Sequence, residues 1–228
     1  MIPILLALMT SMGSPSSVLS MSHDGLSSLW SICANGLSSG VAVQDTVRMT
    51  LRVAPEGNQA RYRVREQLAM LEFPNDAVGQ TSEVWGAIVL NPDGSVDLAE
   101  SRIQVDLAAL TSDSERRDGF LRRNTLETDQ HPTLTLVPTF LRGLPNPLPE
   151  TGDHRFSLVG DLLLKGECFP TAWEVEATFV NGAVLGRAST VVTFQSVGLE
   201  KPQVGSVLSV ADDIRLEIDF RMVPNQFP

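Results

Sequence analysis

Apolar and polar residues alternate along most of the chain after residue 45, with the period of two that a half-buried β-strand shows. Each alternating segment is short and is followed by a turn signal. About nine segments of this kind follow one another, over residues 46–53, 61–68, 84–90, 101–107, 134–140, 156–164, 173–179, 190–194 and 214–220. Strands at this spacing, without helices between them, indicate an antiparallel sandwich or barrel rather than a parallel sheet.

Turn and helix signals divide these segments. Asn91-Pro-Asp-Gly94 is a turn sequence, and Asn181-Gly182 is the strongest short hairpin signal. One helix is predicted in the series: Ser112 to Glu115 fits a capping box, and a helix over residues 115–126 follows it.

The chain divides into three parts. Residues 1–44 hold a short apolar run over residues 2–9 and then Ser- and Gly-rich sequence, which predicts a leader followed by a disordered linker. Residues 45–222 form the predicted β domain, and 223–228 a C-terminal tail. The apolar run is too short for a stable membrane span, which takes about 20 residues. We therefore expect export and an extracytoplasmic location, although a cytoplasmic protein with an apolar tail is the alternative.

The net charge of the chain and the spacing of its cysteines and histidines limit the classes of function that the sequence allows. The formal charge of −10 disfavours general binding to nucleic acid or to anionic membrane surfaces. The cysteines and histidines show no metal-ligand spacing, so we predict no metal and no cofactor. Whether the two cysteines form a disulfide is left open by the sequence. The two cysteines are Cys33 and Cys168, and the three histidines are His23, His131 and His154.

One hydrolase-like motif is present. Gly36-Leu-Ser38-Ser-Gly40 matches G-x-S-x-G, but catalysis requires a strand before this motif and a helix after it. Here the motif lies in the predicted linker, so we predict no catalytic residues and a protein that is not an enzyme.

An ordered series of short motifs resembles the YceI-like family of bacterial lipid-binding proteins. The stretches that carry the resemblance are Tyr62-Arg-Val-Arg-Glu-Gln-Leu68, Val84-Trp-Gly-Ala-Ile88, Ser101-Arg-Ile-Gln-Val-Asp-Leu107, His131-Pro132, Phe156-Ser-Leu-Val-Gly160 and Asp213-Ile-Arg-Leu-Glu-Ile218. The resemblance implies an all-β, antiparallel, lipocalin-like extended barrel of about eight strands with one short helix. It also implies that the lumen holds a polyisoprenoid or a similar fatty amphiphile.

The apolar strand faces are the candidate lumen. The predicted lining residues are Val84, Ile88, Ile103, Val105, Leu107, Leu134, Leu136, Phe156, Leu158, Leu162, Trp173, Val175, Ile214, Leu216 and Ile218. The same residues would fill a dry core if the barrel were solid. The alternative to a carrier of a long-chain isoprenoid is therefore a structural or protein-interaction barrel, and the oligomeric state is left open, a homodimer included.

Four arginines cluster in the predicted helix of this acidic chain: Arg116, Arg117, Arg122 and Arg123. One interpretation is a solvated helix surface with local acidic partners. The other is that Arg117 and Arg122 contact an anionic headgroup, because guanidinium forks match phosphate and carboxylate oxygens.

Overall fold

The computed structural model describes residues 48–70, 72–203, 205 and 207–225. The predicted leader and linker, with Cys33 and the Gly36–Gly40 motif, therefore lie outside the described residues. The first described strand begins at Met49, and the last continues to Pro224, two residues into the predicted tail.

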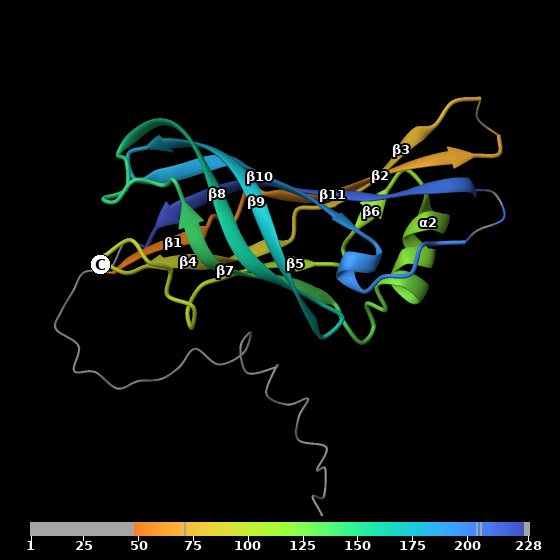
Figure 1. Ribbon diagram of the computed structural model, residues 1–228, viewed down its shortest axis with the longest axis horizontal. Coiled ribbons are helices and arrows are strands. Elements are labelled where there is room, and N and C mark those ends of the chain that lie inside the picture. Colours follow the sequence, from red (N-terminus) through yellow and green to blue (C-terminus); the bar gives the residue numbers. More distant parts are fainter. Residues whose placement is uncertain (1–47, 71, 204, 206, 226–228) are drawn as a thin grey trace, which may run out of the picture.

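Eleven strands form one antiparallel sheet (Figure 1). Their bounds are β1 Met49–Val53, β2 Gln59–Leu68, β3 Asn75–Thr81, β4 Val84–Leu90, β5 Arg102–Asp106, β6 Thr111–Ser112, β7 Thr133–Arg142, β8 Thr151–Leu164, β9 Glu167–Val180, β10 Ala183–Thr193 and β11 Val207–Pro224.

The sheet closes into a barrel because β1 pairs with both β4 and β11. The closed circuit runs β1-β4-β5-β7-β8-β9-β10-β11, eight strands, which confirms the predicted antiparallel barrel. The long strand β11 makes this possible: residues 222–224 pair with β1, while residues 207–219 pair with β2. Strands β2, β3 and β6 thus extend the sheet beyond the closed part (Figure 1).

Strand β3 was not predicted, and its composition explains why. Its buried positions are Ala77, Gly79 and Thr81, which carry too little apolar surface to show an alternation. Gly79 is nevertheless required, since it lies opposite Tyr62 of β2. A Cβ at residue 79 would stand 2.2 Å from Cε1 of the Tyr62 ring, so the ring packs directly on the glycine backbone.

The hairpin prediction at Asn181-Gly182 is confirmed. These two residues join β9 to β10 with φ of 50° and 82°, and two successive positive φ angles are what a type I′ turn requires.

The helical segment lies as predicted, but its cap does not. Helix α2 spans Glu115–Phe120 and continues as the π-helical turn η2, Leu121–Thr125. The N-cap is Ser114, whose Oγ accepts a hydrogen bond from the backbone N–H of Arg117 at 3.4 Å. The predicted cap at Ser112 is therefore wrong by two residues, because its hydroxyl donates instead to Oδ1 of Asp118.

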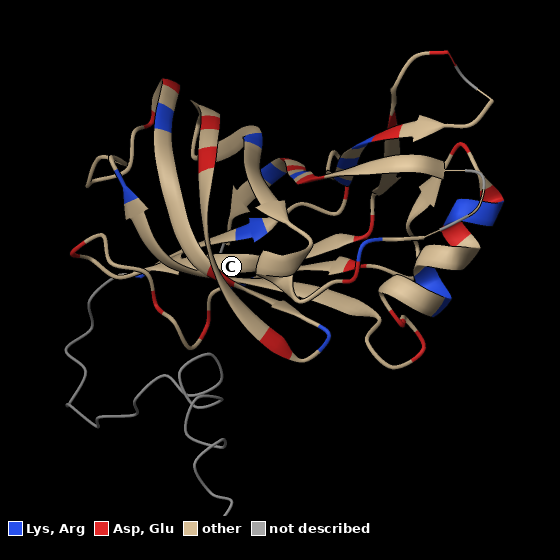
Figure 2. Cartoon of the chain, turned by 45° about the vertical axis from the view of Figure 1, so that its right-hand side comes forward, with Lys and Arg blue, Asp and Glu red and all other residues tan. Residues whose placement is uncertain are grey.

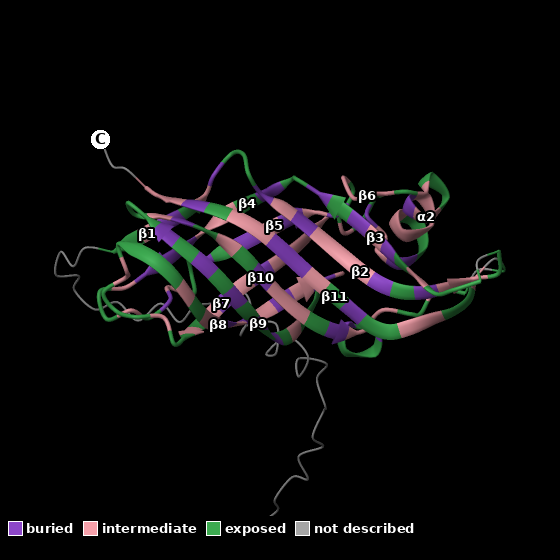
Figure 3. Cartoon of the chain, turned by 90° about the horizontal axis from the view of Figure 1, so that it is seen from above, coloured by how far each residue is buried: buried purple, intermediate pink, exposed green. Residues whose placement is uncertain are grey.

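Buried and exposed residues alternate along the strands, as Figure 3 shows. One cluster of buried apolar side chains runs through the barrel interior. Towards β1 and the start of β10 it is filled by Leu51, Phe179, Val184 and Met222. The interior is therefore solid at that end, and open space lies instead near β2 and α2.

Candidate functional site

A cavity of about 580 Å³ opens among β2, β11, the ends of β5 and β7 to β10, and the helical segment. Its walls are mainly aliphatic and aromatic side chains. Ligand pockets commonly occupy about 300–1,000 Å³, so the cavity has the size and the apolar character of a site for an elongated organic molecule.

The predicted lumen residues divide between this cavity and the packed core. Those that border the cavity are Val105, Leu107, Leu134, Leu162, Trp173, Ile214, Leu216 and Ile218. Those that lie in or against the packed core, away from the cavity, are Val84, Ile88, Ile103, Leu136, Phe156, Leu158 and Val175. Alternation along a strand identifies the inward face but not the depth at which the barrel is hollow.

Trp173 contributes an apolar surface to the inner part of the cavity. Its side chain is 1% exposed, and its indole N–H donates to Oγ1 of Thr171 at 2.9 Å. The Thr171 hydroxyl in turn donates to the carbonyl of Gly160 at 3.0 Å. Because the polar edge of the indole is satisfied within the protein, only the apolar ring remains for contact with a ligand.

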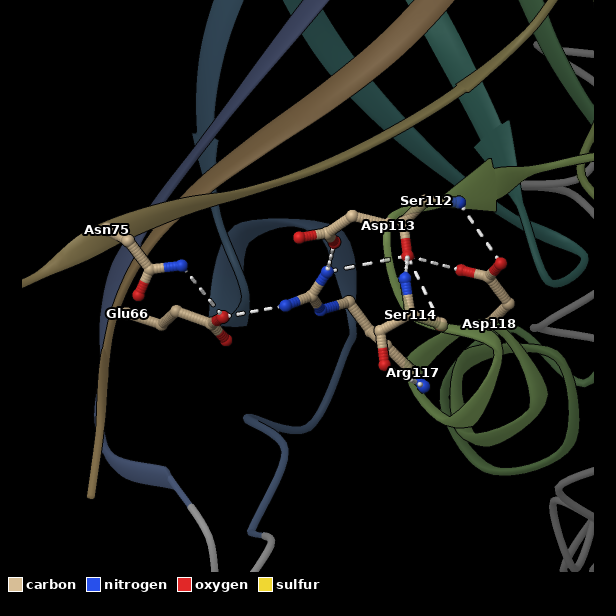
Figure 4. Close-up of polar contacts among 7 residues, drawn as sticks. All are labelled: Glu66, Asn75, Ser112, Asp113, Ser114, Arg117 and Asp118. Atoms are coloured by element: carbon tan, nitrogen blue, oxygen red, sulfur yellow. Dashed lines mark hydrogen bonds and ion pairs between the residues drawn. The ribbon is translucent and has the colours of Figure 1, made fainter. Parts of the chain in front are cut away.

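A network of charged side chains forms one wall of the cavity where α2 meets β2 (Figure 4). The Arg117 guanidinium donates to Oε1 of Glu66 at 2.8 Å and also pairs with Asp113. The Glu66 side chain is 8% exposed and that of Arg117 18%. Although burial works against the charged guanidinium, the hydrogen bond with Asp113 and the charge of Glu66 raise the pKa of Arg117.

The helix end is held in place by the other half of this network. Asp118 is buried and accepts from the backbone N–H of Ser112 at 3.0 Å as well as from its hydroxyl. Since Ser112 belongs to β6 and Asp118 to α2, these bonds fix the helix against the sheet (Figure 4). Arg117 is thereby held at the cavity wall.

Sequence reasoning missed Glu66, although a signal was present. Glu66 lies on the same strand face as Val64 and Tyr62, two and four residues away, and that face points into the barrel. A carboxylate at a core-facing position needs a partner, because burying an unpaired charge is strongly unfavourable. The partner is the arginine at residue 117.

Tyr62 places an unsatisfied hydroxyl beside this network. Its Oη is buried and has no hydrogen-bond partner among the described residues. Burial raises the pKa of Tyr62 to about 12, an effect that the positive charge of Arg117 partly opposes. The phenol therefore stays neutral at ordinary pH.

The arginines of the helical segment separate into two groups. Arg116 and Arg123 border the cavity, are exposed, and form no ion pair with any residue that the structure describes. Figure 2 shows basic residues along this segment. Arg122 faces a different place: its Nε donates to the carbonyl of Asp118 at 3.3 Å, and it borders only a separate pocket of about 10 Å³.

Neither a metal site nor a membrane-spanning helix is found among residues 48–225, with positions 71, 204 and 206 excepted. In that part of the chain, no three His, Cys, Asp or Glu side chains come together in a group able to hold a metal ion. No described helix is long and apolar enough to cross a bilayer. His154 packs edge-on against Phe179, with ring centroids 5.4 Å apart.

An antiparallel barrel with an apolar cavity at one end is the architecture of lipocalin-type binding proteins. The chain belongs to the YceI-like domain family, whose family model matches residues 51–222. This is a family of binding proteins, as the motif resemblance implied.

Solved structures agree with the fold. A polyisoprenoid binding domain from Saccharophagus degradans superposes with a TM-score of 0.58 at 9% identity, covering 78% of this chain and 99% of that one. BcnA of Burkholderia cenocepacia superposes with a TM-score of 0.52 at 12% identity, covering 72% of this chain and 94% of BcnA. The YCEI protein of Campylobacter jejuni superposes with a TM-score of 0.53 at 13% identity, covering 71% of this chain and 91% of the Campylobacter protein. No curated protein matches the chain in sequence.

Proposed function

We propose that this protein is a non-enzymatic binding or carrier protein that holds one long-chain amphiphile of the polyisoprenoid class in its cavity. The observation that carries the proposal is the apolar cavity of about 580 Å³ within a barrel whose other end is solid. The structural relative from Saccharophagus degradans is a polyisoprenoid binding domain, which supports the choice of ligand class.

Transfer of a hydrocarbon chain from water is sufficient to drive such binding. Each buried methylene contributes about 0.8 kcal/mol, so ten carbons in the cavity contribute on the order of 8 kcal/mol before the entropic cost of association. Apolar lining residues such as Leu134, Leu162 and Leu216 can contact a hydrocarbon chain without hydrogen bonds or charged groups.

The polar end of the ligand would lie beside the helical segment. There Tyr62 offers a hydroxyl without a partner, and Arg116 and Arg123 offer guanidinium groups without ion pairs in the described structure. Arg117 also borders the cavity, but its charge is already matched by Glu66 and Asp113. We therefore assign the headgroup contact to Arg116 and Arg123, with Arg117 beside them, rather than to Arg122.

The extracytoplasmic location inferred from the apolar run at residues 2–9 remains part of the proposal. A carrier outside the cytoplasm would shield an insoluble chain during transfer between membranes. Fractionation of the producing cells, with immunodetection of the protein, tests the location independently of the ligand.

The direct test of the proposed function is organic-solvent extraction of the protein, purified without detergent from its own host, followed by mass spectrometry. We expect one isoprenoid-like or fatty amphiphile per molecule of protein. The rival account, a barrel that serves only as a structural or interaction module, predicts extracts that match a buffer blank. Such a blank, together with no uptake of added long-chain prenol, would reject the proposal.

A further inference from the structure

The most exposed apolar side chains of the described structure lie together at one rim. Met70 is 95% exposed, Phe73 73% and Leu208 68%, and the next large apolar side chain, Phe140, is 54% exposed. Met70 and Phe73 both lie in the segment that joins β2 to β3. Leu208 is adjacent to Val207, which pairs with Leu68 at the end of β2.

This rim is the mouth of the cavity. Met70 is almost fully exposed and yet borders the cavity, as do Leu68 and Val207 behind it. A residue can meet both conditions only where the cavity opens to solvent. The β2–β3 hairpin projects beyond the closed part of the barrel at the same end as α2 (Figure 1).

Exposed apolar side chains grouped in this way normally mark a contact surface. We propose that this rim, formed by Met70, Phe73 and Leu208 and called the apolar rim below, docks on the surface of a phospholipid bilayer. An apolar hairpin tip can enter the boundary between headgroups and acyl chains, as interfacial anchors do.

Basic side chains beside the cavity mouth favour a phospholipid surface as the occupant. Arg116 and Arg123, which also border the cavity and have no ion pair in the described structure, can contact lipid phosphates. The overall charge of −10 opposes a strongly anionic membrane, so we commit to a zwitterionic phosphatidylcholine surface. Docking would place the cavity mouth against the bilayer, where long-chain amphiphiles are dissolved.

The inference goes beyond the proposed function and depends on it only for its biological purpose, since vesicle binding is measured without reference to the cavity's contents. The experiment is flotation of the full chain with phosphatidylcholine vesicles. The rim variant is Met70→Ser with Phe73→Ser. The matched control is Met49→Ser with Phe140→Ser. These are the same residue types, they are also among the exposed apolar residues, and neither borders the cavity. Phe140 lies six residues along β7 from the cavity residue Leu134, about 20 Å at strand spacing.

We expect wild type and control to float with vesicles, and the rim variant to lose at least about tenfold in partition coefficient, since two large apolar contacts are removed. Met70 and Phe73 are mostly exposed, so the thermal melt of the rim variant should match that of wild type. Equal flotation of rim and control variants would overturn the proposal. The proposal would also be overturned if wild-type protein stayed in the soluble fraction. That outcome includes a wild type that dimerises through the rim instead of binding vesicles. Uptake of a prenol from solution, measured on the same variants, separates a failure of docking from a failure of the proposed function.

Discussion

At the scale of single residues, Tyr62 is a cavity residue whose only polar side-chain group has no partner among the described residues. Its hydroxyl is buried without a partner, and its ring rests on Gly79. Buried polar groups usually have a hydrogen-bond partner, and a ligand headgroup is one way to supply it.

Tyr62 also predicts a specific dependence on alkaline pH. Burial raises its pKa from 10.0 to about 12, so the unfolded chain loses the proton first as pH rises. The stabilisation is complete below pH 10 and is lost progressively up to about pH 12, with a total of about 3 kcal/mol. Tyr62 is the only tyrosine in the chain, so tyrosinate absorbance reports it directly.

We expect the absorbance midpoint near 12 in the folded protein, and near 10 in denaturant. Tyr62→Phe should remove this part of the loss of stability measured by urea unfolding between pH 10 and 12. A midpoint near 10 under native conditions would show that the phenol is solvated and would remove it from the cavity wall.

Residue patterns also show what the sequence could and could not predict. Val105 and Val175 both follow the alternation, and both are 3% exposed. Only Val105 borders the cavity, because depth along the barrel depends on how side chains from different strands fill it. Glu66 was identifiable as a charged residue on an apolar face, but its partner Arg117 lies 51 positions away in sequence.

At the scale of elements, the helical segment α2–η2 supplies the basic residues of the cavity mouth. The sequence predicted the helix because the signals for a helix are encoded within a few residues, although it placed the cap two residues too early. It did not predict which arginines face the cavity, since this depends on how Asp118 anchors the helix to β6. Strand β3 was missed for the related reason that its buried face is made of small residues that match Tyr62 on β2.

The helical segment yields a prediction on headgroup charge. Replacing Arg116 and Arg123 by Gln should weaken binding of a prenyl phosphate by about tenfold or more, while the matching prenol binds as before. Isothermal titration calorimetry with both ligands measures this. The control is Arg142→Gln with Arg221→Gln, which changes the net charge equally at exposed positions away from the cavity. Equal losses for prenol and phosphate, or an equal effect of the control, would contradict a local charge contact.

At the scale of the whole molecule, the barrel is solid at one end and hollow at the other. The β1–β11 pairing closes the solid end, and the continuation of β11 with β2, β3 and the helical segment surrounds the cavity. The class of fold was predictable because each strand carries its own alternation and turn. The division of its interior was not, because it arises only when all strands have assembled.

The central claim, that this cavity holds a long-chain amphiphile, is tested most directly by measuring prenol binding to delipidated wild type, Val105→Phe and Val175→Phe. In the cavity the added ring enters open space, so Val105→Phe should reduce affinity at least about tenfold with nearly unchanged stability. In the packed core the same change should cost about 1–3 kcal/mol through overpacking and leave prenol affinity within about twofold. If Val105→Phe binds prenol as wild type does, or if wild type binds none, the account is wrong.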